Sequence, residues 1–352
     1  MGGKALKNTS TTRLSKADFD RVSAVVEAGL RQRFPQARVA VIPAYFSKSD
    51  FGDLDVLVSA EGVQAQGGTE ELKKLALEVF NATELFKNGN VLSFDYRATP
   101  QQTDPGFQVD VITMPDESFE FALNYFSFND LGNLVGRTAH KQGCSFGHDG
   151  LWYYFRDGDY KFRELLLTRD FDLALRFLGY DPKRFHAGFE GLTDIFEYVA
   201  GSTFFNRSIF LLENRNYQSR VRDRKRKTYT EFLLWCENHP GLPAYTYPED
   251  KAQWLPRLFE WFAPFKEAYA QAERDLQRQR LAKERFNGEL VAQWSGLQDK
   301  ELGGLMKRVR ESFGSQEDFY AFVLASSAEE LKAYVLQRLS ERQDTSADSP
   351  SP

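Results

Sequence analysis

The chain has 352 residues with 42% hydrophobic and 14% aromatic content, which is enough to bury a sizeable core and predicts two domains. Its net charge of −5 excludes a global positive field, so any contact with nucleic acid must be local. The two cysteines, Cys144 and Cys236, lie far apart and the four histidines are scattered, which argues against a zinc site and a disulfide framework.

The first segment, residues 1–14, is rich in Lys, Ser and Thr and is expected to be disordered. Ser15 is then expected to cap a helix that ends before Pro35. The helix is indicated by an apolar stripe of helical period that consists of Phe19, Val22, Val25, Val26 and Leu30.

A short strand and a polar loop are predicted next. Residues 38–42 form a β-rich run, and the loop 43–50 follows it. The loop carries Ser47 and Lys48, which are able to approach a phosphate group. An ordinary polar turn explains the same residues equally well, so both interpretations stay open.

Two acidic strands carry the main functional signal. Residues two apart in a strand point to the same face, so Asp53 and Asp55 project together from the strand 50–58. The strand 107–112 carries a central acid, Asp110, and placed beside the first strand it would add a third carboxylate. Three carboxylates are enough to hold two divalent cations, Mg²⁺ or Mn²⁺. Solvent-facing alternation on a strand edge is the alternative.

The elements around these strands predict an α+β fold. A helix is expected over residues 69–80, after a Gly-rich break. Residues 91–97 and 107–114 alternate as two strands and are expected to form a hairpin across the loop 99–106. Together these elements describe a small mixed sheet with helices packed on it.

A second candidate site follows in the segment 125–141. A helix is expected to begin near residue 131 with Asn129 or Asp130 as its cap, after the aromatic pair Tyr125 and Phe126. Asp130, Asn133 and Arg137 then share one helix face and suit a nucleotide. A capped helix with a solvated face is the structural alternative. A hairpin, 150–156 with 160–168, and a helix, 170–178, come next.

The order of these parts resembles the palm and thumb of family X DNA polymerases, within the polymerase β nucleotidyltransferase superfamily. The motifs are Gly-Asp-Leu-Asp-Val-Leu at 52–57, Val-Asp-Val at 109–111, and Tyr-Phe-x-x-x-Asp-x-x-Asn-x-x-x-Arg at 125–137. The resemblance covers residues 36–185. It implies a nucleotidyltransferase palm at 15–115, a thumb-like nucleotide-binding subdomain at 116–185, and transfer of a nucleoside monophosphate from an NTP or dNTP.

The resemblance also assigns residue roles. Asp53, Asp55 and Asp110 would be the catalytic ligands of two Mg²⁺ or Mn²⁺ ions, with Asp110 near the attacking 3′ hydroxyl. Tyr125 and Phe126 would contact the sugar of the incoming nucleotide. Asp130 and Asn133 would contact its base, and Arg137 would contact the template side.

The chain also departs from the family. The Gly-Ser that opens the family's triphosphate loop and the Arg-rich turn after it are absent, and Ser47 and Lys48 are the best substitutes. Phe128 stands where the family has Gly, which would put a ring near the sugar. Because one helix is expected before the first strand, we do not expect the family's N-terminal lyase and helix-hairpin-helix modules in this sequence.

The second half of the chain predicts a helical domain at 186–342 and a disordered tail at 343–352. It contains one strongly basic run between Tyr217 and Tyr229, made of Arg220, Arg222, Arg224, Lys225, Arg226 and Lys227. These side chains would neutralise phosphates of a nucleic-acid strand, or they would form a solvated helix face; the two interpretations have even weight.

The sequence therefore predicts a nucleotidyltransferase that extends the 3′ hydroxyl of a nucleic acid, terminally or with weak templating. A template-directed family X-like polymerase and transfer to a protein or small molecule are alternatives. A nucleic-acid-binding module on a degenerate transferase scaffold is an alternative of another class. The chain has neither an apolar run of about 18 residues nor a charged-then-apolar leader, which predicts a cytoplasmic protein that does not bind membranes.

Overall fold

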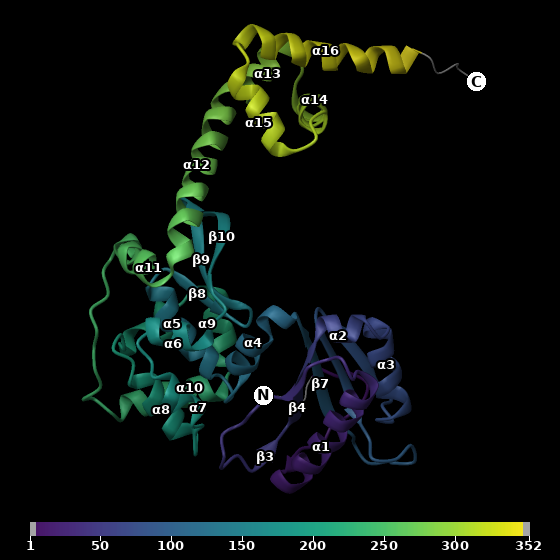
Figure 1. Cartoon of the computed structure of the whole chain (residues 1–352), viewed down its shortest axis with the longest axis vertical. Helices are drawn as coiled ribbons and strands as arrows, with labels where there is room; N and C mark the ends of the chain where they lie inside the picture. The colour runs from purple at the N-terminus through teal and green to yellow at the C-terminus, as the bar shows by residue number, and fades with distance from the viewer. Residues whose placement is uncertain (1–4, 348–352) are drawn as a thin grey trace. The chain divides into compact units, whose positions relative to one another are not determined.

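The structure is a computed structural model that describes residues 5–347 and the side chains of residues 5–341 (Figure 1). The fold is α+β, with a mixed β-sheet and a C-terminal helical region. The chain forms two compact units, one from the residues up to Tyr154 together with Glu164–Phe265, and one from Phe155–Arg163 together with the residues from Lys266 onward. The expected helical domain at 186–342 is therefore divided between the units. Within the described range, no helix combines the length and apolar character needed to cross a membrane.

A five-stranded mixed sheet forms the centre of the first unit. Its strand order is β2-β4-β7-β6-β5, with β2 at Val39–Val41, β4 at Asp53–Ser59, β7 at Phe107–Met114, β6 at Val91–Tyr96 and β5 at Leu85–Asn88. The central pair β4 and β7 is parallel, and the other pairs are antiparallel. The predicted pairing of the two acidic strands and the predicted β6–β7 hairpin are both confirmed.

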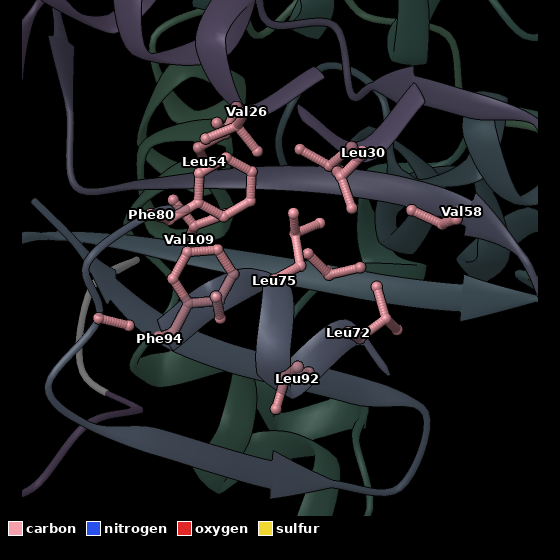
Figure 2. Close-up of a cluster of buried hydrophobic side chains, with 14 of the residues drawn as sticks. Val26, Leu30, Leu54, Val58, Leu72, Leu75, Phe80, Leu92, Phe94 and Val109 are labelled. Atoms are coloured by element: carbon pink, nitrogen blue, oxygen red, sulfur yellow. The ribbon is translucent and has the colours of Figure 1, made fainter. Parts of the chain in front are cut away.

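Helices cover both faces of this sheet. On one face pack α1 (Lys16–Arg33) and α3 (Gly68–Glu78), which follows the short α2 (Ala60–Gln64). Figure 2 shows this core, with side chains that include Val26, Leu30, Leu54, Val58, Leu72, Leu75, Phe80, Leu92, Phe94 and Val109. The predicted cap is confirmed, since the Ser15 side chain accepts from the amide of Asp18. On the other face, Phe119 and Ala122 of α4 (Phe119–Phe126) pack against Leu57, Ile112 and Met114.

The segment before α1 is ordered from residue 5, contrary to the disorder expected for residues 1–14. The amides of Lys7, Asn8 and Thr9 donate to the carboxylate of Glu84 at 2.7–3.2 Å. The strand β1 (Leu14–Ser15) pairs with β3 (Asp50–Phe51). Composition predicted disorder, but a distant carboxylate and a strand edge bind this backbone. Residues 1–4 of the predicted tail lie outside the described residues.

After the central sheet the chain forms α5, then a small antiparallel sheet whose segment Phe155–Arg163 belongs to the second unit, and then short helices. The bounds are α5 Leu131–Lys141, β8 Cys144–Gly147, β9 Gly150–Asp157, β10 Tyr160–Thr168, α6 Phe171–Phe177, α7 Pro182–His186, α8 Leu192–Ala200, α9 Tyr217–Arg224, α10 Lys227–Glu237 and α11 Leu255–Trp261. The strand order β10-β9-β8 confirms the predicted hairpin.

The second unit is built mainly from helices around their own core. They are α12 Ala263–Arg285, which starts at the end of the first unit, then α13 Gly288–Ser295, α14 Asp299–Glu311, α15 Gln316–Ala325 and α16 Ala328–Ala347. The core includes Phe286, Val291, Leu305, Phe319, Val323 and Leu331. α15 was not predicted as a separate helix. α16 continues into the predicted tail as far as Ala347, and residues 348–352 lie outside the described residues.

Candidate metal centre and the basic segment beside it

Three aspartates gather on one face of the central sheet. In the parallel register of β4 and β7, Asp55 lies opposite Asp110, and Asp53 lies two residues before Asp55. The alternating side chains, such as Leu54, point into the core on the other face. One carboxylate oxygen from each of the three aspartates lies within 4.8 Å of the others. The structure therefore brings the three predicted ligands together.

Two further side chains hold Asp110. The amide nitrogen of Gln108 donates to both of its carboxylate oxygens, at 3.1 and 3.0 Å. Ser93, which lies opposite Asp110 on β6, donates from its hydroxyl. The sequence reasoning missed both residues. The contact of Gln108 could have been predicted, because Gln108 lies two positions before Asp110 and hence on the same strand face. The contact of Ser93 could not, because it depends on the pairing register of β6 with β7.

The three carboxylates disfavour one another's charge. Burial raises the pKa of Asp55 to about 8, and the charges of Asp53 and Asp110 act in the same direction. Burial also raises the pKa of Asp110, although the hydrogen bonds from Ser93 and Gln108 oppose that shift. Carboxylate oxygens are the ligands that Mg²⁺ prefers, and a divalent cation would relieve this repulsion. The donor set therefore fits the expected metal ions.

Lys48 is the cation beside this cluster. Burial lowers the pKa of its ammonium group, while the negative charges of Asp53 and Asp55 oppose the shift. Its Nζ lies 3.5 Å from Oδ1 of Asn129 and 4.8 Å from the centre of the Phe51 ring. Ser47 lies next to it in the loop, and its backbone amide donates to the carbonyl of Glu190 at 2.9 Å. Of the two predicted loop residues, Lys48 is thus the one placed against the acids.

The predicted aromatic pair lies at the end of α4. The rings of Tyr125 and Phe126 meet edge to face with 5.4 Å between centroids, and Phe126 stacks on His148 at 5.6 Å. Gly132 of α5 approaches this pair closely: a Cβ there would lie 2.3 Å from the carbonyl oxygen of Tyr125. Only glycine permits that approach. Both aromatic side chains remain half-buried, so they retain some accessible surface.

Phe128 does not place its ring where the resemblance suggested. The ring packs against Phe189 at 4.8 Å and Phe185 at 5.4 Å, and only 7% of the residue is exposed. The backbone has φ of 61° at Phe128 and 63° at Asn129. A positive φ is readily adopted by glycine, which stands at the first of these positions in the family, and is strained for phenylalanine. The backbone turn is thus glycine-like, while the ring belongs to the core.

The predicted polar face of α5 exists, but the chain itself covers it. Arg226 donates from Nη1 to Oδ1 of Asp130 at 2.5 Å, and Nη2 of Arg222 lies 3.4 Å from Oδ1 of Asn133. Arg137 is buried, and its guanidinium donates to the carbonyl of Ile209 at 3.2 and 3.1 Å. Arg137 is therefore a packing residue, and its predicted contact with a template side is not available in this structure.

The basic segment, Arg220–Lys227, does not lie on one continuous helix. It breaks between α9 and α10, and Arg226 has an extended backbone with φ of −92° and ψ of 108°. Arg222 and Arg226 face α5, and Lys227 pairs with Glu231 at 3.5 Å. Across the part of the chain that the structure describes, the side chains of Arg220, Arg224 and Lys225 form neither a hydrogen bond nor an ion pair.

A buried aspartate fixes the orientation of α9. Asp223 is fully buried and forms ion pairs with Arg215 at 2.9 Å and with Arg222 at 3.1 Å. This carboxylate points inward, and Arg220, three residues before it, is half-buried, whereas Arg224 is exposed. Within the basic segment, Arg222 and Arg226 thus contact α5, while Arg224 and Lys225 are exposed without such a contact.

The chain matches no protein-family model, and a search of curated proteins gives no match either. The resemblance to the polymerase β superfamily consequently rests on the sequence motifs alone.

Proposed function

We propose that this protein is a metal-dependent nucleotidyltransferase that transfers a nucleoside monophosphate from an NTP or dNTP to the 3′ hydroxyl of a nucleic acid. Residues 15–115 would form a palm and residues 116–185 a thumb-like subdomain. The observation that carries the proposal is the convergence of Asp53, Asp55 and Asp110 from two parallel strands, with one oxygen from each within 4.8 Å of the others. Such a cluster suits two divalent cations.

The residues of the chain would divide the work as follows. When bound, the two Mg²⁺ or Mn²⁺ ions would lower the pKa of the attacking hydroxyl and neutralise the triphosphate and the leaving pyrophosphate. Asp53 and Asp55 would hold the ions from β4, and Asp110 would present its carboxylate beside the hydroxyl. The hydroxyl oxygen would form a bond to the α-phosphorus as the bond between that phosphorus and the pyrophosphate oxygen breaks.

The acceptor is proposed from the basic side chains of α9, of which Arg224 is exposed and Arg220 is half-buried. Arg220 and Arg224 lie three and seven residues after Tyr217, so the three side chains share one face of α9. Tyr217 is 72% exposed, which is unusual for so large a ring. Cations that track a phosphate backbone next to an aromatic ring that stacks on a base are typical of single-strand binding. This surface therefore supports a nucleic-acid acceptor.

Purified protein incubated with Mg²⁺ or Mn²⁺, each labelled NTP or dNTP, and single-stranded, primed or tRNA-like acceptors tests the proposal directly. We expect extension of at least one acceptor on a denaturing gel. Asp53→Asn and Asp110→Asn should reduce it by about 100-fold or more, since each removes a metal ligand. Asp104→Asn, at an exposed loop aspartate, is the matched control and should retain full activity.

The same assay separates the alternatives. If the label appears on the protein itself or on a small molecule, the reaction is still nucleotidyl transfer but the acceptor is not a nucleic acid. Binding of nucleic acid without any transfer, and without metal-dependent binding of nucleotide, would favour a binding module on a degenerate scaffold and would reject the proposed enzyme.

A further inference from the structure

We infer that the basic segment is divided between the two substrates: Arg222 and Arg226 bind the triphosphate of the incoming nucleotide, and Arg220, Arg224 and Lys225 bind the acceptor strand. The inference deepens the proposed function and rests on it. It replaces the single nucleic-acid surface that was one interpretation of the basic run in the sequence. It also supplies the triphosphate contacts that the loop at residues 43–50 provides only in part.

The charge balance of the site calls for more cations than the loop contains. A nucleoside triphosphate carries about four negative charges, and three aspartates leave two divalent ions with a surplus of only about one positive charge. Lys48 is the cation that the loop itself places against the acids. The neighbouring backbone amide, that of Ser47, already donates to Glu190. Further positive charge must come from outside the loop.

A continuous set of contacts leads from the metal centre to the two arginines. Lys48 lies beside Asn129, with 3.5 Å between Nζ and Oδ1. The next residue, Asp130, holds Arg226 at 2.5 Å. The phenol of Tyr125, the residue expected to face the sugar, experiences the positive charges of both Arg226 and Arg222, which oppose the rise in its pKa caused by burial. Both guanidinium groups therefore belong to the nucleotide side of α5.

The arginines keep donors for a ligand while α5 holds them in position. A guanidinium has five N–H donors, and the bond to Asp130 uses Nη1 of Arg226. Arg226 is 33% exposed and Asp130 24% exposed, so the pair is accessible from solvent. A guanidinium already fixed by a carboxylate loses less conformational freedom when it binds phosphate. This arrangement suits a bidentate phosphate contact.

The helix break separates Arg226 from the cations of α9. In an unbroken helix, Arg226 would lie one turn after Arg222 and on the same helix face. The extended backbone at Arg226 ends the helix before that turn is complete, and the Arg226 side chain instead binds Asp130. Arg222 stays on α9, and its Nη2 lies 3.4 Å from Oδ1 of Asn133. Arg220 and Arg224 share the face of α9 that carries the exposed Tyr217. The two sets therefore face different surroundings.

Steady-state kinetics with both substrates varied tests the division. Arg226→Ala should raise KM for the nucleotide by about ten-fold and leave KM for the acceptor within about two-fold, because a charge-assisted phosphate contact is lost. Arg226→Lys should restore part of the loss. The pair Arg220→Ala/Arg224→Ala should show the reverse pattern. Arg21→Ala, an exposed arginine of α1, is the control and should change neither constant.

One variant removes a trivial explanation. Arg226→Ala leaves Asp130 unpaired, and its bare carboxylate would itself repel a triphosphate. In Asp130→Asn/Arg226→Ala that repulsion is gone, so a KM for the nucleotide that stays about ten-fold high supports direct binding. A return of KM to the wild-type value would overturn the inference. Thermal unfolding of each variant confirms that the fold is intact.

The inference and the proposed function fail in different ways. Equal rises in the acceptor KM for Arg226→Ala and for Arg220→Ala/Arg224→Ala, with an unchanged nucleotide KM, would overturn the division but leave the enzyme in place. Equilibrium binding of a non-hydrolysable ATP analogue with Mg²⁺ gives the second readout. Binding by wild type that weakens in Arg226→Ala and persists in Arg224→Ala supports the inference, whereas no binding by wild type rejects the proposed function itself.

Discussion

The side-chain amide of Gln108 holds both carboxylate oxygens of Asp110, at 3.1 and 3.0 Å, and accepts a hydrogen bond from the backbone amide of Ala5 at 2.9 Å. Gln108 is buried, with 2% of its surface exposed, so it fixes the orientation of Asp110 without facing a substrate. It acts as a positioning residue. The ordered N-terminal segment is in this way connected to the metal centre through one side chain.

We therefore expect Gln108→Ala to lower kcat by about ten-fold, which corresponds to ~1.4 kcal/mol, while KM for the nucleotide changes little. Gln108→Glu should lower kcat further, because it adds a fourth carboxylate to the cluster. Steady-state kinetics of the two variants checks this. Unchanged kcat in both variants, with the fold intact, would show that Asp110 needs no such support.

The raised pKa of Asp55 predicts an unusual pH dependence of stability. The folded carboxyl keeps its proton up to about pH 8, whereas the unfolded one releases it near pH 4. Between these values the unfolded chain binds fewer protons, so the free energy of unfolding of the metal-free protein should fall as pH rises. Mg²⁺ should reverse this loss, because it binds the ionised carboxylates of the folded state.

Asp55→Asn gives the matched comparison. It removes the titrating group, so its stability should stay flatter between pH 4 and about 8, and it should exceed metal-free wild type at pH 8 by on the order of 1–2 kcal/mol after solvent screening. It should also gain little from Mg²⁺. Urea unfolding at several pH values measures both effects, and parallel pH profiles for the two proteins would contradict the raised pKa.

Asp223 predicts a large stability effect in a segment that reads as a solvated basic run. Its carboxylate is fully buried between Arg215 and Arg222, and the Arg215 side chain is only 4% exposed. Asp223→Ala would leave the charge of Arg215 buried and unpaired, which costs about 3–5 kcal/mol. The exposed partner of Lys227, Glu231, is the control, and Glu231→Ala should cost at most ~0.5 kcal/mol. If Asp223→Ala changes the free energy of unfolding in urea only slightly, the Arg215 guanidinium must become hydrated in the variant instead of staying buried and unpaired.

The cluster of Asp53, Asp55 and Asp110 could be predicted because a strand has a period of two. That period alone assigns Asp53 and Asp55 to one face, and the apolar residues between them identify the other face as the buried one. The pairing with the Asp110 strand needed only the assumption that two apolar strands lie side by side. The local rule and the tertiary structure agree here, so the predicted convergence of the three aspartates is confirmed, and their binding of metal ions stays a prediction.

The face of α5 shows where such reasoning stops. Helical spacing correctly put Asp130, Asn133 and Arg137 on one side, but spacing does not reveal what lies opposite that side. The occupants are Arg226, Arg222 and the carbonyl of Ile209, each more than 70 residues away in the sequence. A polar helix face has the same pattern whether it meets a ligand or another part of the chain. Only the tertiary structure separates these cases.

Glu84 makes the same point for the N-terminal segment and leads to a further prediction. Nothing near residues 5–9 in the sequence orders them; the carboxylate that accepts their amides lies 75–77 residues away. The hydrogen bond from the amide of Lys7 leads those that lower the pKa of Glu84. The carboxylate therefore stays charged under mildly acidic conditions and continues to hold the segment.

Glu84→Ala should accordingly speed hydrogen exchange at the amides of Lys7, Asn8 and Thr9, since each loses its acceptor. The amide of Thr12 donates instead to the carbonyl of Gly106 at 2.9 Å and should remain protected. Glu78→Ala, an exposed glutamate at the end of α3, should change neither set of rates. Because Ala5 lies two residues before Lys7 and donates to Gln108, release of the segment should also lower kcat in the direction expected for Gln108→Ala. Faster exchange with an unchanged kcat would separate the anchoring of this segment from the orientation of Asp110.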